Sequence, residues 1–144
     1  MNYDKINGYL VDIFNNVVII EEASLKNSKF NDVSLKEMHT IDVIGTHSDT
    51  TPSAVARELM LTLGTVTTSL NKLEKKGYII RTRSSVDRRV VHLSLSKKGR
   101  LVYRLHRGFH KSMVMRITEG FNDEELKVMS KGLENLHAFL EELK

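Results

Sequence analysis

The sequence contains no cysteine among its 144 residues. A chain without thiols forms no disulfide bonds, offers no thiolate to a metal ion and cannot sense redox state through cysteine. Proline occurs only once, at Pro52, and we find no low-complexity run and no internal repeat. This composition favours a mostly helical chain.

Long apolar runs are also missing. No stretch of 18 apolar residues occurs, which is the length that a membrane-spanning helix would need. The N-terminal residues Met-Asn-Tyr-Asp-Lys lack the basic and then apolar pattern of a signal peptide. We therefore expect a cytoplasmic protein, and the 40% apolar content suits one compact domain or two small subdomains that share a core.

Acidic residues are scarce in one segment. Residues 72–111 contain thirteen Lys or Arg but only Glu74 and Asp87 as acids, a net charge of +11, whereas the other 104 residues carry a net charge of −7. A basic block beside an acidic remainder is typical of proteins that bind a polyanion. A charged face that merely contacts solvent is the alternative.

Apolar spacing and capping residues predict the elements. Ser34 with Glu37, Thr51 before Pro52, and Asn122 with Glu125 are expected helix starts. The helices are predicted at 3–25, 34–45, 51–60, 62–76, 96–119 and 122–143, with a loop at 26–32 and strands at 78–83 and 90–95.

The predicted helix 62–76 has two different faces. Val66, Leu70 and Leu73 share one face, and a rotation of about 100° per residue places a polar set opposite them. Near the start of the helix these side chains are short and can form hydrogen bonds, and further on they are cationic. The set is Gly64, Thr67, Thr68, Asn71, Lys72 and Lys75, with Thr65 at its flank. After it, the two strands flank a polar turn with adjacent arginines. This order indicates a DNA-reading helix followed by a charged hairpin, or wing.

The last predicted helix carries a heptad pattern. Its apolar residues follow steps of 3, 4, 3, 4 and 3, at Leu126, Met129, Leu133, Leu136, Leu140 and Leu143. Packing within one chain could explain this seam, and a contact between two chains explains it at least as well.

The whole series of elements resembles the MarR family of winged helix-turn-helix regulators. The residues that carry the resemblance are Glu58-Leu59, Val66, Leu70, 73–79, Asp87-Arg88-Arg89 and 93–99. Met60 departs from it, because the family often has glycine in this turn, so the backbone there either avoids positive φ or tolerates it. The resemblance implies a mainly α fold with a small β-hairpin wing, a DNA-binding region at 33–96 and a helical dimerisation region at 1–32 and 97–144.

The resemblance also implies roles in DNA binding. Thr67, Thr68 and Asn71 would approach base edges in the major groove of an A/T-rich palindrome, and Gly64 would leave room there. Thr65 and Lys72 would contact phosphates. Arg88 or Arg89 would enter the minor groove, with Asp87 bracing one of them. Further phosphate contacts are expected from Lys97, Lys98 and Arg100.

Within the family, the chain is similar to repressors of fatty-acid-synthesis genes over residues 13–17, 36–41 and 63–70. This similarity implies a corepressor, an acyl chain on acyl carrier protein, and no other cofactor. The acidic carrier would contact a basic patch, for which Arg104, Arg107 and Lys111 are candidates. An acyl chain would suit a cleft lined by flexible apolar residues, although a plain core is the alternative for them: Phe14, Val17, Val18, Met38, Ile41, Leu105, Phe109 and Met113.

Other function classes have weaker support. We expect no enzyme, because no phosphate-binding glycine loop and no nucleophile motif occur. His106 and His110 have the spacing of a two-histidine metal site but lack an apparent third ligand, so no metal is expected. RNA readers usually stack bases on exposed aromatics, and only Tyr78 and Tyr103 lie in the basic block. A protein-interaction module, or a MarR-type repressor released by a small aromatic or lipophilic ligand, remains open.

Overall fold

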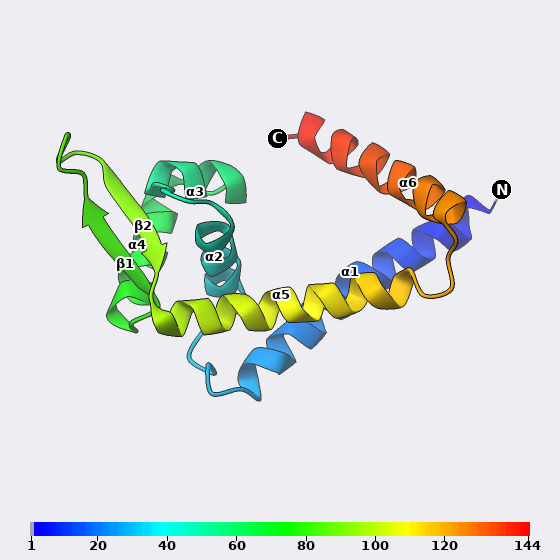
Figure 1. The fold of residues 1–144 in the computed structure, drawn as a ribbon, viewed down its shortest axis with the longest axis horizontal. Coiled ribbons are helices and arrows are strands. Elements are labelled where there is room, and N and C mark those ends of the chain that lie inside the picture. The colour runs from blue at the N-terminus through cyan, green and yellow to red at the C-terminus, as the bar shows by residue number, and fades with distance from the viewer. Residues whose placement is uncertain (1) are drawn as a thin grey trace. The chain divides into compact units, whose positions relative to one another are not determined.

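The computed structural model describes residues 2–144 and confirms a mainly α fold with one β-hairpin (Figure 1). The elements are α1 (Tyr3–Lys26), α2 (Leu35–Thr46), α3 (Pro52–Leu59), α4 (Leu63–Lys75), β1 (Ile79–Arg83), β2 (Val91–Leu95), α5 (Lys97–Ile117) and α6 (Asp123–Glu142). β1 and β2 pair antiparallel, with Ile79 opposite Leu95 and Arg83 opposite Val91. No helix within residues 2–144 has the length and apolar character that crossing a membrane requires.

The predicted helix starts are confirmed. The Ser34 hydroxyl accepts the Glu37 N–H at 3.1 Å, and the Glu37 carboxylate accepts the Ser34 N–H at 3.2 Å. Asn122 and Glu125 form the same reciprocal capping box on α6. Thr51 caps α3 ahead of Pro52, whose missing N–H costs nothing at that position. These caps fix where α2, α3 and α6 begin.

Met60 ends α3 in the left-handed conformation, with φ at 54°. The Met60 N–H bonds to the Arg57 carbonyl, and the Leu61 N–H bonds to the Ala56 carbonyl at 2.9 Å. The backbone therefore tolerates positive φ at this residue, because the turn satisfies the carbonyls that the end of α3 leaves open. A residue with a Cβ pays roughly 1–2 kcal/mol for this conformation.

The chain divides into two compact units, Met1–His106 and Arg107–Lys144. The core of the first unit joins α2, α3, α4 and the hairpin, and its fully buried side chains include Ile41, Val55, Val66, Leu70 and Leu73. In the second unit, no residue of α6 is buried. The predicted division into 33–96 and flanking dimerisation helices stays a prediction.

A polar clamp holds the end of α4. The Lys76 ammonium donates to both carboxylate oxygens of Glu37 at 3.0 Å, and the Tyr78 hydroxyl donates to Asp32 Oδ1 at 2.5 Å. The hydrogen bond from Tyr78 lowers the pKa of Asp32. Burial and the same bond raise the pKa of Tyr78. The exit of α4 is thus fixed to the loop before α2.

Gly99 brings α5 against the same exit. A Cβ at this residue would lie 2.1 Å from the Tyr78 carbonyl oxygen. The Ser96 N–H donates to that oxygen, and the Ser96 hydroxyl donates to the Gly77 carbonyl at 2.6 Å. The first turn of α5 therefore packs directly on the backbone between α4 and β1, which holds α4 and the hairpin together.

Candidate DNA-binding interface

The two faces of α4 differ in burial as predicted. Val66, Leu70 and Leu73 are at most 1% exposed, so they fix the rotation of the helix in the first unit. The polar set on the opposite side is exposed throughout: Gly64, Thr65, Thr67, Thr68, Asn71, Lys72 and Lys75. The residues assigned to DNA on this helix therefore form one continuous exposed face.

The hydroxyl groups of this face are already oriented. Thr67 donates to the Leu63 carbonyl at 2.8 Å, and Thr68 donates to the Gly64 carbonyl at 3.1 Å. Thr65 bonds to the Thr62 hydroxyl that caps the helix. Because the Thr67 and Thr68 protons are used within the helix, each hydroxyl can still accept a hydrogen bond and each methyl group can contact an apolar partner. A thymine methyl is such a partner in the major groove.

Gly64 has open space where a side chain would begin. Apart from the neighbouring residues and the backbone of α4 itself, no described atom lies within 4 Å of a Cβ built at this residue. Packing inside the protein therefore does not require glycine here. A glycine at the start of a DNA-facing helix allows the close approach of another molecule.

The turn between β1 and β2 is rigidly hydrogen-bonded. The Ser84 N–H donates to the Val90 carbonyl at 2.9 Å, and the Val90 N–H donates to the Asp87 carbonyl at 3.0 Å. The Ser84 hydroxyl accepts the N–H groups of Val86 and Asp87. Arg83 donates to the Arg88 carbonyl at 3.0 Å. The tip of the wing is therefore an ordered loop that extends from the sheet (Figure 1).

Asp87 pairs with Arg89 and not with Arg88. Arg89 donates from Nε to Asp87 Oδ1 at 3.1 Å and from its terminal nitrogen to Oδ2 at 3.2 Å. These bonds hold the pKa of Asp87 below its usual range. A carboxyl with a lowered pKa stays ionised until the pH falls below its ordinary value near 4, so the brace is intact at neutral pH. Within residues 2–144, no carboxylate pairs with Arg88, which is the free cation of the turn.

The three cations at the start of α5 differ in their surroundings. Lys97 is exposed. Lys98 lies over the Tyr78 ring, with Nζ 4.3 Å from the ring centroid, and donates to the Lys76 carbonyl. Arg100 donates to the Leu95 carbonyl at 3.1 Å. Only Lys97 of the three therefore lacks an internal contact among the described residues, which makes it the best placed for a phosphate.

Comparison with known proteins agrees with this geometry. The model of the MarR family matches residues 33–91, which span α2 to the start of β2. The crystal structure of Streptococcus pneumoniae FabT in complex with DNA has 65% sequence identity and a TM-score of 0.90, and the alignment covers 99% of both chains. The chain belongs to the MarR family.

Two curated relatives from Bacillus subtilis are less similar in sequence. The HTH-type transcriptional regulator PchR is 28% identical over 98% of this chain and 82% of its own. The HTH-type transcriptional regulator YwhA is 32% identical over 69% of this chain and 73% of its own. The chain is thus a DNA-binding transcriptional regulator of the MarR type, and the relatives that match it are regulators rather than enzymes.

The residues expected to line an acyl cleft have mixed surroundings. Met38 and Ile41 belong to the closed core of the first unit, at 3% and 0% exposure. Val17 is half-buried, whereas Phe14, Val18 and Leu105 are exposed. In the second unit, Phe109 and Met113 are half-buried. Met38 and Ile41 are therefore ordinary core residues, which was the alternative to their lining a cleft. The acyl cleft itself stays a prediction.

The candidate carrier-protein contacts all lie on α5. Arg104, Arg107 and Lys111 are exposed. Arg104 also lines a pocket beside β2 that the sequence did not indicate. Its other lining residues come from segments far apart along the chain, so no local motif could have identified it.

His106 has acidic neighbours that the sequence analysis missed. Glu21 is 5% exposed, and its Oε1 lies 3.5 Å from His106 Nδ1. Asp42 Oδ1 lies 3.9 Å from His106 Nε2. Glu21 is on α1 and Asp42 is on α2, so only the tertiary fold brings them to this histidine. These contacts tie α1, α2 and α5 together within the first unit.

Proposed function

We propose that this chain is a dimeric, sequence-specific repressor of fatty-acid-synthesis genes and that acyl-acyl carrier protein is its corepressor. The observation that carries the proposal is the 65% identity to Streptococcus pneumoniae FabT along 99% of both chains. Residues 13–17, 36–41 and 63–70 support the same assignment, because they resemble the fatty-acid-synthesis repressors of the family.

The exposed face of α4 supports recognition of an A/T-rich site. Asn71 can pair with adenine through two hydrogen bonds, and the threonine methyl groups can pack on thymine. Arg88 is free to enter a narrow minor groove, where A/T tracts concentrate negative potential. The α4 face and Arg88 together suit a half-site whose bases are contacted in the major groove and whose adjacent minor groove binds the arginine.

A homodimer is supported by the unburied seam of α6. Leu133, Leu140 and Leu143 are 53%, 46% and 65% exposed, and no residue of this helix is buried. Burying such a seam against a second copy would remove apolar surface from water. Two copies would then present their recognition helices to half-sites about 34 Å apart, one turn of DNA.

The corepressor can be tested by titration into a DNA-binding assay. Acyl-acyl carrier protein should increase the affinity of the purified protein for its operator, and unacylated carrier protein should increase it less. Lys111→Glu should remove the gain, because an acidic carrier would then meet a like charge. Lys131→Glu on α6 is the matched control and should retain the gain.

The outcomes separate the proposal from its alternatives. No gain from the acylated carrier would contradict its role as corepressor. A loss of DNA affinity on adding it, or on adding a free lipophilic ligand, would instead support a MarR-type repressor that its ligand releases. An absence of specific DNA binding would favour a protein-interaction module on the same fold.

A further inference from the structure

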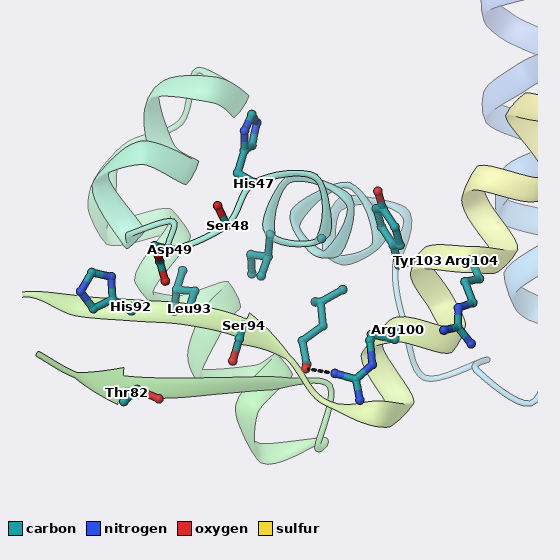
Figure 2. Close-up of a pocket in the computed structure, with 13 residues that line it drawn as sticks. His47, Ser48, Asp49, Thr82, His92, Leu93, Ser94, Arg100, Tyr103 and Arg104 are labelled. Carbon is teal, nitrogen blue, oxygen red and sulfur yellow. Dashed lines mark hydrogen bonds between the residues drawn. The ribbon is translucent and has the colours of Figure 1, made fainter.

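A pocket of about 670 Å³ lies beside β2 in the first unit (Figure 2). Its walls come from the end of α2, the loop that follows it, the hairpin and the first turns of α5. Its lining residues include no member of the exposed α4 face, of the expected acyl cleft or of α1, although they do include Arg100, an expected phosphate contact, and Arg104, a candidate carrier-protein contact. The pocket is therefore distinct from the α4 face and from the acyl cleft.

One end of the pocket is cationic. Arg100 and Arg104 enter it from successive turns of α5, as Figure 2 shows. Arg100 uses one terminal nitrogen to bond to the Leu95 carbonyl, which fixes its position and leaves its other N–H groups for a ligand. In the part of the chain that the structure describes, no carboxylate pairs with either guanidinium. Two unpaired guanidinium groups in one wall suit an oxyanion.

The other end of the pocket carries a carboxylate and an imidazole. Figure 2 shows Asp49 and His92 there, distant along β2 from the arginines. His92 Nδ1 is buried and has no hydrogen-bond partner among the described atoms. A buried polar atom without a partner is costly and uncommon, and among the lining residues the structure shows one at His92. The Asp49 carboxylate at the same end also favours a ligand that donates.

The loop at this end is held under strain. Asp49 has φ at 53°, in the left-handed region. The neighbouring Thr50 carbonyl accepts the Leu93 N–H at 2.8 Å, so the loop is tied to the open edge of β2. Strained residues that the surroundings hold in place are common at ligand sites. The strain therefore fixes Asp49 beside His92.

The pocket also has apolar walls. Ile44, Leu93 and Leu95 line it and are 3%, 3% and 7% exposed. The Tyr103 ring adds a further apolar wall. A ligand that spans the pocket would place its uncharged part against these side chains.

We propose that this pocket binds a small molecule with an oxyanion at one end, a hydrogen-bond donor such as an amine at the other, and a short apolar spacer between them. A simple anion would face the Asp49 carboxylate. A simple cation would face Arg100 and Arg104. Only a molecule with both groups matches the two ends of the pocket, and the proposal does not rest on fatty-acid control.

The pocket adjoins the DNA-binding wing. His92 pairs with Thr82 one position before the last strand pair, Arg83 with Val91, and the wing turn follows directly. A ligand that joins His92 to α5 would restrict the movement of β2 relative to the helices. We therefore expect the bound molecule to change the affinity for DNA.

Isothermal titration calorimetry of the full chain tests the proposal with defined probes. The probes are 4-aminobutyl phosphate, 5-aminopentanoate, butyl phosphate and inorganic phosphate, and the first two separate phosphate from carboxylate as the preferred oxyanion. We expect 4-aminobutyl phosphate or 5-aminopentanoate to bind at least about tenfold more tightly than butyl phosphate, the scale of one hydrogen bond to a charged group.

Variants locate the binding. His92→Phe and Arg100→Gln should each weaken the better probe by about tenfold or more. His92→Phe removes an unsatisfied buried nitrogen, so its thermal unfolding temperature should stay the same or rise. The matched control Lys97→Gln, also on α5 but outside the pocket, should bind the probe as the unmodified protein does.

Three results would overturn the proposal. The first is no binding of any probe at millimolar concentration. The second is equal binding of butyl phosphate and 4-aminobutyl phosphate with no binding of 5-aminopentanoate, which would mean that the pocket recognises only an anion. The third is binding that neither variant weakens. If the oxyanion is a DNA phosphate, Arg100→Gln will reduce the salt dependence of DNA binding by about one unit and no probe will bind, which also contradicts the proposal.

Discussion

At the scale of single residues, Gly64 separates folding from DNA binding. An added methyl group would meet no described atom within 4 Å beyond its neighbours and the backbone of α4, so Gly64→Ala should stabilise α4 by up to about 1 kcal/mol. The same methyl group would occupy the space that we assign to the duplex. We expect the thermal unfolding temperature to hold or rise while DNA affinity falls about tenfold or more, as measured by calorimetry and fluorescence anisotropy. A variant that binds DNA normally would remove Gly64 from the interface.

Asp87 gives a second test at this scale. Whether DNA affinity rises or falls on removing its carboxylate shows whether Asp87 acts through its charge or by ordering Arg89. Removing an acid from a DNA-facing surface should increase affinity if its charge alone matters. If Asp87 orders Arg89, Asp87→Ala should lower affinity by about three- to tenfold. We expect the lower affinity in anisotropy measurements at fixed salt. Arg88→Ala is the comparison, because it removes the free cation without breaking the ion pair with Arg89.

At the scale of elements, Tyr78 links the exit of α4 to the loop before α2. Tyr78 is fully buried and its hydroxyl bonds to Asp32, so Tyr78→Phe should cost about 1 kcal/mol of unfolding free energy at neutral pH. The lowered pKa of Asp32 means that this bond stabilises the fold above the ordinary pKa and is lost as the pH falls below it.

The lowered pKa of Asp32 also predicts how the effect of Tyr78→Phe on the free energy of unfolding depends on pH. The difference between the unmodified protein and Tyr78→Phe should be constant from about pH 7 to pH 5 and should shrink below about pH 4. Urea unfolding across this range measures it. Tyr9→Phe, at an exposed position on α1, is the control and should change little. A difference that grows on acidification would contradict the assigned role of Asp32.

The elements themselves could be predicted because their signals are local. Ser34 with Glu37 and Thr51 with Pro52 set helix starts within one turn of sequence, and the structure confirms them. The partner of Asp87 could not be chosen, since both arginines are adjacent and the hydrogen bonds of the turn decide which one reaches it. The pocket beside β2 was missed because Asp49, His92 and Arg100 come to line one cavity only after folding.

At the scale of the whole molecule, the seam of α6 should hold two chains together. Leu133→Glu would place a charge within the proposed contact, and burying an unpaired charge costs several kcal/mol. We expect this variant to sediment as a monomer and to lose affinity for the full inverted repeat. Val128→Glu, which is exposed on α6 but off the seam, should leave the dimer intact. An unmodified protein that sediments as a monomer at micromolar concentration would contradict the dimer.

The central claim is that two copies of the α4 face and the Asp87-Arg88-Arg89 wing read a specific palindrome. The most direct measurement is fluorescence anisotropy with an inverted repeat recovered from random duplexes, compared with the same duplex after its half-sites are scrambled. At about 150 mM salt we predict an A/T-rich repeat with half-sites about one turn apart, bound about a thousandfold more tightly than the scrambled duplex. Equal affinity for the two duplexes would contradict the account.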